Sequence, residues 1–445
     1  MIRAIQEKDL ILIHNVQLRK YARRYVDIQN QFYKQVESFG LPFDRDEGPA
    51  RDRETATLMT HLTSLGVIDF YNNSESICLG RKSSACQACA KGIGTATLFI
   101  SFQCHRNCYF CFNPNQNNYE YYKTSKNDWR RELQQISASG EKLSHLALTG
   151  GEPLLHDEDT VEFFRFARKL YPDVHTRLYT AGDLLTVSIL EKLAQTELNE
   201  IRFSIKMEDL KESRQELLKK IALAKEYIRD VMVEMPVIPG TLDEMKELLL
   251  TLDQLGIYGI NLLEFCFPLN NTGEFAARGF RIKYPPHPVL YNFWYAGGLP
   301  IAGSEIDALK LLEFAAEKKL RLGVHYCSLT NKHFGQIYRQ NTTWKCTDKT
   351  MQFSDKDFYL KAAKVFGKDI QPVKSILQKA GVVDFTYNSE CRFLQFHPRY
   401  IELLKEIDPE IGISTCVQEY RPDGVVLREL KCDYTTAKIF DEKDI

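Results

Sequence analysis

Three cysteines lie close together in the segment CHRNCYFC, at Cys104, Cys108 and Cys111. Their C-x3-C-x2-C spacing can bring three thiolates to one small object on a tight loop. An iron–sulfur cluster of the [4Fe-4S] type takes four ligands, so three protein thiolates leave one iron open for a substrate or a cofactor. Structural zinc prefers four ligands with a pairwise spacing of their own, and a disulfide is disfavoured without an export signal. The segment therefore favours an iron–sulfur cluster.

A second group of cysteines precedes this loop, in the segment CLGRKSSACQACAKGIG. It consists of Cys78, Cys86 and Cys89, and a C-x2-C pair with a third cysteine nearby is typical of half a metal site. Cys327, at the end of VHYC, is the expected fourth ligand, and Cys346, in TWKC, is the less favoured one. The residues alone leave three interpretations open: a second iron–sulfur cluster, a zinc ion, and free thiols.

Short apolar runs alternate with amphipathic, helix-like segments from residue 94 to about residue 265. This alternation is typical of βαβ units and predicts a parallel sheet. Six strands are expected, at residues 95–102, 145–151, 175–182, 200–206, 231–240 and 259–265. We therefore predict an α/β fold, a partial (β/α)6 TIM-like barrel with a helical N-terminal cap and a small α+β C-terminal module.

Three domains are expected from these patterns. Residues 1–93 form a helical N-terminal region with the second cysteine group, residues 94–330 form the barrel, and residues 331–445 form the C-terminal module. Residues 266–303 are rich in Pro, Gly and aromatic residues and predict a long loop, of the kind usually kept for function. A β-hairpin is expected around residues 421–424.

The composition argues against several classes of function. The 445 residues include 58 basic and 59 acidic side chains, so the formal net charge is -1. No overall positive field exists to attract nucleic acid or an anionic membrane. No apolar run is long enough to cross a bilayer, and the N-terminal segment lacks the apolar core of a signal peptide. We expect a cytoplasmic protein with neither a membrane nor a nucleic-acid partner.

The cysteine loop resembles the signature of the radical S-adenosylmethionine (SAM) superfamily. In that family the same spacing follows the first barrel strand, and an aromatic residue, here Phe110, precedes the last cysteine. The segment LTGGEP is similar to the family's GGEP motif after the second strand. The Phe-Asn-Pro sequence after Cys111 is closest to the activating-enzyme-like branch. The resemblance implies that the open iron chelates the amino and carboxylate groups of SAM's methionine moiety.

The resemblance also implies a set of residues around SAM, although ordinary barrel packing is an alternative for those on the later strands. Glu152 is expected to receive the SAM amino group, because a carboxylate suits an ammonium. The expected SAM-site residues are Phe110, Gly150, Gly151, Glu152, Pro153, Tyr179, Ser204, Lys206 and Pro239.

The activity that the resemblance implies is reductive cleavage of SAM to a 5'-deoxyadenosyl radical, which abstracts hydrogen from a substrate. A peptide or protein is the first expectation for that substrate. A small metabolite or a nucleoside is the alternative, and a non-catalytic iron–sulfur electron carrier is the alternative from another class. The resemblance further implies an electron donor such as a flavodoxin or a ferredoxin, an anaerobic setting, and a possible second [4Fe-4S] cluster.

Overall fold

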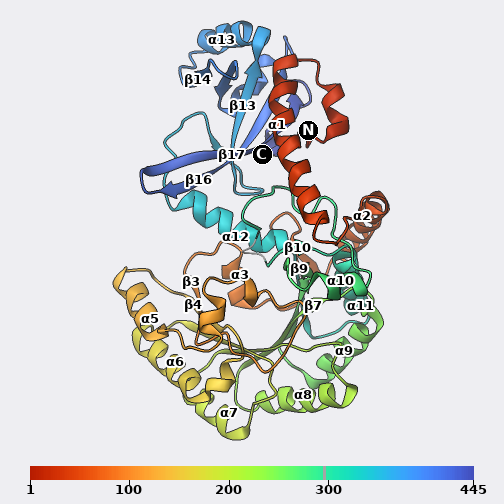
Figure 1. The fold of residues 1–445 in the computed structure, drawn as a ribbon, viewed down its shortest axis with the longest axis vertical. Coiled ribbons are helices and arrows are strands. Elements are labelled where there is room, and N and C mark those ends of the chain that lie inside the picture. Colours follow the sequence, from red (N-terminus) through yellow and green to blue (C-terminus); the bar gives the residue numbers. More distant parts are fainter. Residues whose placement is uncertain (294–296) are drawn as a thin grey trace. The chain divides into compact units, whose positions relative to one another are not determined.

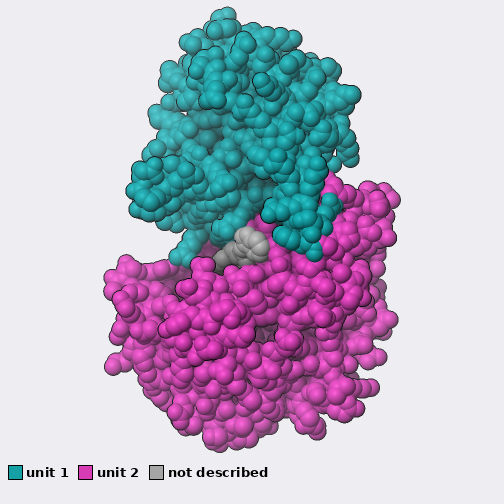
Figure 2. Space-filling view, in the orientation of Figure 1, with its two compact units in different colours: residues 1–39, 288–292, 334–445 teal, residues 40–287, 293–333 magenta. Residues whose placement is uncertain are grey.

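The computed structural model describes residues 1–293 and 297–445 of the chain. These residues form two compact units, coloured separately in Figure 2. The central unit comprises residues 40–287 and 293–333, and the terminal unit comprises residues 1–39, 288–292 and 334–445. The division into three domains at residues 93 and 330 stays a prediction.

The central unit is built on one nine-stranded sheet. Its strand order is β1-β2-β11-β8-β7-β6-β5-β4-β3, and the strands from β3 to β8 and β11 run parallel. The sheet does not close, because β1 and β3 lie at its two ends. Its strands are β1 Ile68–Tyr71, β2 Ser76–Leu79, β3 Thr95–Phe99, β4 His145–Thr149, β5 His175–Thr180, β6 Glu200–Phe203, β7 Asp230–Val237, β8 Gly259–Glu264 and β11 Gly323–Cys327.

Helices cover the outer face of this sheet, and Figure 1 shows them following the arc of the strands. Apolar side chains of the strands, such as Leu148, Leu178 and Phe203, pack against the helices in one large core. These helices are α2 Gly48–Ser64, α5 Trp129–Ala138, α6 Asp157–Leu170, α7 Val187–Ala194, α8 Lys211–Ala224, α9 Leu242–Leu255 and α11 Ser304–Glu317. The six expected parallel strands and the partial barrel are therefore confirmed.

The inner face of the arc carries polar side chains. Alternate residues of a strand point to opposite faces, so where apolar residues face the helices, their neighbours in the strand, such as Arg202, face inward. The parallel register places Tyr179 of β5 beside Arg202 of β6. Each follows a core residue of its own strand, Leu178 and Ile201. A short helix, α3 (Ser84–Cys89), lies against this inner face, and Figure 1 shows it inside the arc. The Ser83 hydroxyl, which precedes α3, donates a hydrogen bond of 2.6 Å to Glu200. Helix α3 thus packs against the inner face where β6 begins.

The long segment expected at residues 266–303 contains short elements, and residues 294–296 lie outside the described part of the chain. Strands β9 (Cys266–Phe267) and β10 (Leu299–Pro300) pair in it, and helix α10 (Thr272–Ala277) lies between them. Shorter helical segments occur elsewhere in the central unit: η2 Asn113–Asn115, α4 Tyr119–Tyr122 and η3 Pro153–His156.

The terminal unit is a second α+β structure. Its sheet has the order β14-β15-β13-β16-β17, with β12 paired to β13. The hairpin expected around residues 421–424 joins β16 to β17 and is confirmed. The strands are β12 Gln352–Phe353, β13 Leu360–Phe366, β14 Phe385–Asn388, β15 Phe393–Phe396, β16 Glu410–Arg421 and β17 Gly424–Thr436. The helical segments are η1 Glu7–Leu12, α1 Val16–Glu37, η5 Gly367–Asp369, α13 Ile370–Lys379, η6 Pro398–Leu404 and η7 Glu442–Asp444, while α12 (Leu329–Thr342) begins in the central unit. None of the helices described in either unit is both long and apolar enough to span a membrane.

Candidate active site

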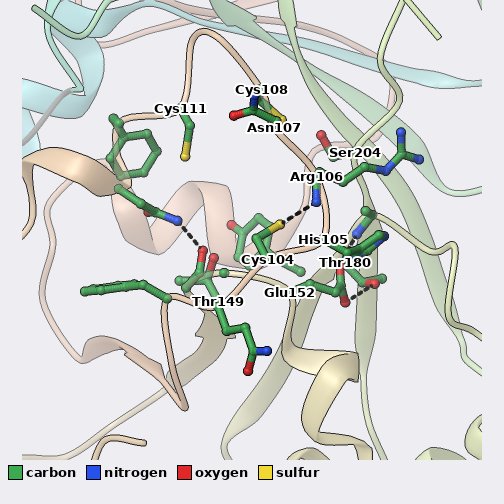
Figure 3. A pocket seen from close by; sticks show the side chains of 18 of the residues that line it. Cys104, His105, Arg106, Asn107, Cys108, Cys111, Thr149, Glu152, Thr180 and Ser204 are labelled. Carbon is green, nitrogen blue, oxygen red and sulfur yellow. Dashed lines mark hydrogen bonds between the residues drawn. The ribbon is translucent and has the colours of Figure 1, made fainter. Parts of the chain in front are cut away.

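A cavity of about 810 Å³ opens inside the central unit, at the carboxyl ends of the parallel strands. Active sites of barrel enzymes gather at this end of the strands, because the loops that follow the strands converge there. Figure 3 shows the side chains that surround it. Nine of the residues expected at the site line this cavity: Cys104, Cys108, Cys111, Gly150, Gly151, Glu152, Tyr179, Ser204 and Lys206.

The three loop thiols, Cys104, Cys108 and Cys111, stand around one space on the loop after β3 (Figure 3). Burial raises the pKa of Cys104, and it raises the pKa of Cys111 to about 11. Both thiols therefore keep their protons near neutral pH, and a metal that binds them must displace these protons. In the described residues no three Cys, His, Asp or Glu side chains are arranged around a single metal ion. The donor set fits an iron–sulfur cluster held by three cysteines.

Side chains from other segments hold the cysteine loop in place. Arg106 forms ion pairs of 2.5 Å with Asp183 and 2.6 Å with Asp209. The Asn271 amide donates 2.9 Å to the backbone carbonyl of Tyr109, and the Asn270 amide donates 3.3 Å to that of Cys111. Sequence analysis missed these four supporting residues, since no local pattern connects them to a loop far away in the chain. The loop is positioned by its neighbours and has little regular structure of its own.

The glycine pair after β4 packs directly against the strand-to-loop segment before Cys104. The Gly151 amide donates 2.9 Å to the carbonyl of Ser101, and the Glu152 amide donates 2.8 Å to that of Gln103. A Cβ atom at position 151 would lie 1.9 Å from the Gln103 carbonyl oxygen. Only glycine therefore allows this approach, which fixes the turn and the cysteine loop to each other.

The Glu152 carboxylate is 3% exposed and is held by three donors. It accepts hydrogen bonds of 3.0 Å from the Leu154 amide, 2.7 Å from the Thr180 hydroxyl and 2.7 Å from the Ala181 amide. Burial raises its pKa, while these three hydrogen bonds act in the opposite direction. A carboxylate has about four acceptor positions. One position is thus left for a donor in the cavity.

Buried charges line the deeper part of the cavity. Arg202, which is 2% exposed, is paired with Glu200 and with Glu234. Coulombic attraction from Arg202 helps to keep the pKa of Glu200 well below its usual range, against the opposing effect of burial. Lys206 and Lys332 also line the cavity, and within the described residues neither ammonium has an ion-pair or hydrogen-bond partner. The cavity therefore presents free positive charge to whatever occupies it.

Three of the expected SAM-site residues do not line this cavity as the structure describes it. Phe110 packs edge to face against Tyr109 and Phe265, with ring centroids 5.1 and 5.7 Å apart. Pro153 is buried at the start of η3. Pro239 lines a separate cavity of about 380 Å³, next to Arg281 and Asp307. A role for these three residues at SAM stays a prediction.

The second cysteine group, with Cys327, lies on the inner face of the same unit. We call Cys78, Cys86, Cys89 and Cys327 the inner thiols. Cys346, the less favoured fourth ligand, belongs to the terminal unit. No three Cys, His, Asp or Glu side chains of the described chain are arranged to hold a single metal ion, and this applies to the loop thiols as well as to the inner thiols.

Comparison with known families identifies the segment that carries the site. Residues 98–252 match the model of the Radical SAM superfamily. A protein of Methanocaldococcus jannaschii, provisionally named a glycyl-radical enzyme activating enzyme, is 32% identical over 253 residues, which are 54% of this chain and 62% of that protein. The chain thus spans less than two thirds of that relative's length. The expected resemblance to the superfamily and its activating-enzyme-like members is confirmed.

Solved structures give weaker likenesses. SuiB of Streptococcus suis is 13% identical, with a TM-score of 0.39 over 75% of this chain and 67% of that chain. The protein anSMEcpe, solved with AdoMet and a Cp18Cys peptide, is 15% identical, with a TM-score of 0.37 over 58% of this chain and 68% of that chain. At TM-scores this low, neither likeness carries an argument.

Proposed function

We propose that the chain is a radical SAM enzyme that binds a [4Fe-4S] cluster on Cys104, Cys108 and Cys111, since residues 98–252 match the model of that superfamily. The observation that carries the proposal is the meeting of two motifs at one cavity. The C-x3-C-x2-C loop follows β3, the GGEP turn follows β4, and both line the same space of about 810 Å³. When bound, such a cluster supplies the electron that cleaves SAM to methionine and a 5'-deoxyadenosyl radical.

The residues of this chain have distinct tasks in that activity. The three loop thiols hold the cluster and leave one iron open. Glu152 accepts the SAM amino group at its remaining acceptor position, next to the donors Thr180 and Ala181. Lys206, whose ammonium is free in the described chain, offers a positive charge to the SAM carboxylate. The walls of the cavity keep water from the radical, which would otherwise be lost in side reactions.

The substrate that we propose is a peptide or a protein. The support is the name of the M. jannaschii relative, which describes an enzyme that acts on another protein, a glycyl-radical enzyme. The electron donor is proposed to be a small reduced carrier protein of the flavodoxin or ferredoxin class. We further propose a cytoplasmic, anaerobic setting, since oxygen destroys exposed clusters of this type.

The test is SAM cleavage by the full chain. After anaerobic reconstitution with iron and sulfide, dithionite and SAM are added, and 5'-deoxyadenosine is measured by liquid chromatography. We expect multiple turnovers or at least one equivalent of product from the unchanged chain, and a loss of more than 100-fold when Cys104, Cys108 and Cys111 are all replaced by Ala.

Replacement of Cys391 by Ser is a matched control, because Cys391 is a half-buried thiol of the terminal unit. This variant should keep full activity. Production of 5'-deoxyadenosine that survives the triple substitution would contradict the proposal.

A further inference from the structure

The inner thiols come from parts of the chain that only the fold brings together. Cys78 lies on β2, Cys86 and Cys89 lie on α3, and Cys327 ends β11. Strands β2 and β11 pair antiparallel, so Cys78 and Cys327 lie two positions apart on the same face of the sheet. The Lys82 ammonium interacts electrostatically with all four sulfur atoms. Four thiols therefore share one region inside the strand arc.

Buried N–H groups donate to two of these sulfur atoms. The Asn261 amide lies 3.2 Å from the Cys86 sulfur, and the Arg202 guanidinium lies 3.4 Å from it. The Asn331 amide lies 3.2 Å from the Cys327 sulfur. A neutral thiol is a weak acceptor, whereas a negatively charged sulfur is a strong one. Three buried donors directed at two sulfurs thus suit sulfur atoms that carry negative charge.

The surrounding charges lead to the same conclusion. Lys82 is 8% exposed and donates 2.8 Å to the Ser76 hydroxyl, but it has no carboxylate partner in the described chain. Lys332 likewise has no ion pair there, and it interacts electrostatically with Cys327, with the Glu234 carboxylate that Arg202 already pairs, and with Cys89. Buried cations are costly unless an anion compensates them. Four cysteine thiolates around an iron–sulfur core carry net negative charge and would supply that anion.

Zinc and a polynuclear cluster differ in how close they need their thiolates. Zinc binds sulfur at about 2.3 Å, so a single ion needs its sulfurs within about 4 Å of one another. The described residues contain no group arranged for a single ion. A polynuclear cluster has a larger core and holds its thiolates farther apart.

We propose that Cys78, Cys86, Cys89 and Cys327 bind a second, four-iron cluster inside the strand arc. Asn261, Asn331 and Arg202 donate to its cysteine sulfurs, and Lys82 and Lys332 offset its charge. The site shares no ligand with the cysteine loop, so it can exist whether or not the chain cleaves SAM.

The test separates the two sites by composition. The full chain in which Cys104, Cys108 and Cys111 are replaced by Ala is reconstituted anaerobically with ferrous iron and sulfide, and then desalted. Iron, sulfide and zinc are measured per chain, and the cluster type is read by Mössbauer spectroscopy. We expect about four irons and about four sulfides to remain, compared with about eight irons in the unchanged chain.

Further replacement of Cys86 and Cys89 by Ser should reduce the remaining iron to near zero. Cys266→Ser in the same triple background is the matched control, because Cys266 is a half-buried thiol that also interacts with Lys332 but is outside the set. That control should keep about four irons. Far-ultraviolet circular dichroism checks that each variant is folded.

Three results would overturn the proposal: no iron in the folded triple variant, about one zinc per chain in place of iron, or iron that survives the Cys86 and Cys89 substitutions. None of them would affect the proposed SAM cleavage, which depends on the loop thiols. A donor variant gives a second measurement that does not depend on loss of the site. Asn331→Leu removes one N–H donor to Cys327, so we expect the cluster to remain and its reduction potential to fall.

Discussion

The loop thiols and the inner thiols lie in one unit but are supported in opposite ways. Cys104 is exposed, and its loop is held through backbone contacts from Asn270 and Asn271 and through the ion pairs of Arg106. The inner thiols stand on strands and a helix, and side chains donate directly to two of them, Cys86 and Cys327. The first arrangement leaves the metal side of the loop open to a cavity. The second buries Cys78 and Cys327 in the protein, while Cys86 is half-buried and Cys89 is exposed.

This difference separates two tasks. A site that binds a cofactor and a substrate needs an open coordination position and a space beside it; three thiols next to the cavity would meet both needs. A site with four thiols and compensating cations leaves no position open, so it suits structural support or electron transfer. Changes in the inner region should therefore alter the stability of the unit, whereas changes near the loop should alter iron content and SAM binding.

Arg202→Met should have the largest effect. The substitution leaves the carboxylates of Glu200 and Glu234 buried without their cation, and Glu200 is only 1% exposed. Breaking a buried ion pair in this way costs about 3–5 kcal/mol. Urea unfolding followed by circular dichroism should show that loss. Arg214→Met, which breaks a partly exposed pair with Glu244, is the control and should cost less than about 1 kcal/mol. If the two substitutions lowered the free energy of unfolding equally, the buried ion pairs of Arg202 would stabilise the unit no more than the partly exposed pair of Arg214.

Gly151→Ala should act on the loop and spare the inner region. The new methyl group would meet the Gln103 carbonyl oxygen at 1.9 Å, so the backbone beside Cys104 has to move. We expect iron per chain to fall from about eight to about four, with a stability loss of about 2–4 kcal/mol. Gly273→Ala is the control, because a Cβ at that helical position meets no atom within 4 Å. Full iron content in Gly151→Ala would show that the tight packing is not needed for the cluster.

Glu152→Gln should weaken SAM binding and leave iron unchanged. The amide still fills the site, but it cannot pair as a charge with the SAM ammonium, and such a charge-assisted hydrogen bond contributes about 1.5–3 kcal/mol. We expect the SAM dissociation constant to rise about 10- to 100-fold in equilibrium dialysis. Iron and sulfide analysis of the same sample checks the cluster. Unchanged SAM affinity would restrict Glu152 to its hydrogen bonds with Leu154, Thr180 and Ala181.

The sequence predicted which residues would meet at the cavity because the signals for them are local. The spacing of Cys104, Cys108 and Cys111 lies within eight residues, and the six parallel strands appear as short apolar runs. The GGEP turn was expected to approach SAM, whereas the structure also shows why glycine is required next to Gln103. That contact joins two loops separated along the chain, so no local pattern could reveal it.

The inner region was predictable only in part, for the same reason. The sequence suggested that Cys78, Cys86, Cys89 and Cys327 belong together, but it gave no hint of Asn261, Asn331 or Lys332. A visible signal did exist for Arg202, because Glu200 and Arg202 alternate with the apolar Ile201 and Phe203 in one short strand. A charge at such a position indicates a polar inner face and a buried partner.

His145→Gln should have the smallest effect and tests whether the inner face is shielded from solvent water. His145 lies at the start of β4, 3.2 Å from the Ser84 hydroxyl at the beginning of α3. Burial, together with His175 and Arg177, lowers its pKa to about 4. An unfolded histidine titrates near 6.5, so between about pH 6.5 and pH 4 the unfolded chain binds a proton that the folded chain does not. Stability is therefore greatest above about pH 6.5 and falls as the pH is lowered through this window.

Since the side chain is only half-buried, we expect its share of that fall to be about 1 kcal/mol. Urea unfolding at pH 7.5 and at pH 5 measures it: the two chains should differ little at pH 7.5, and the loss on going to pH 5 should be smaller in His145→Gln. Identical losses in both chains would mean that His145 is solvated and that α3 does not seal the inner face at that end.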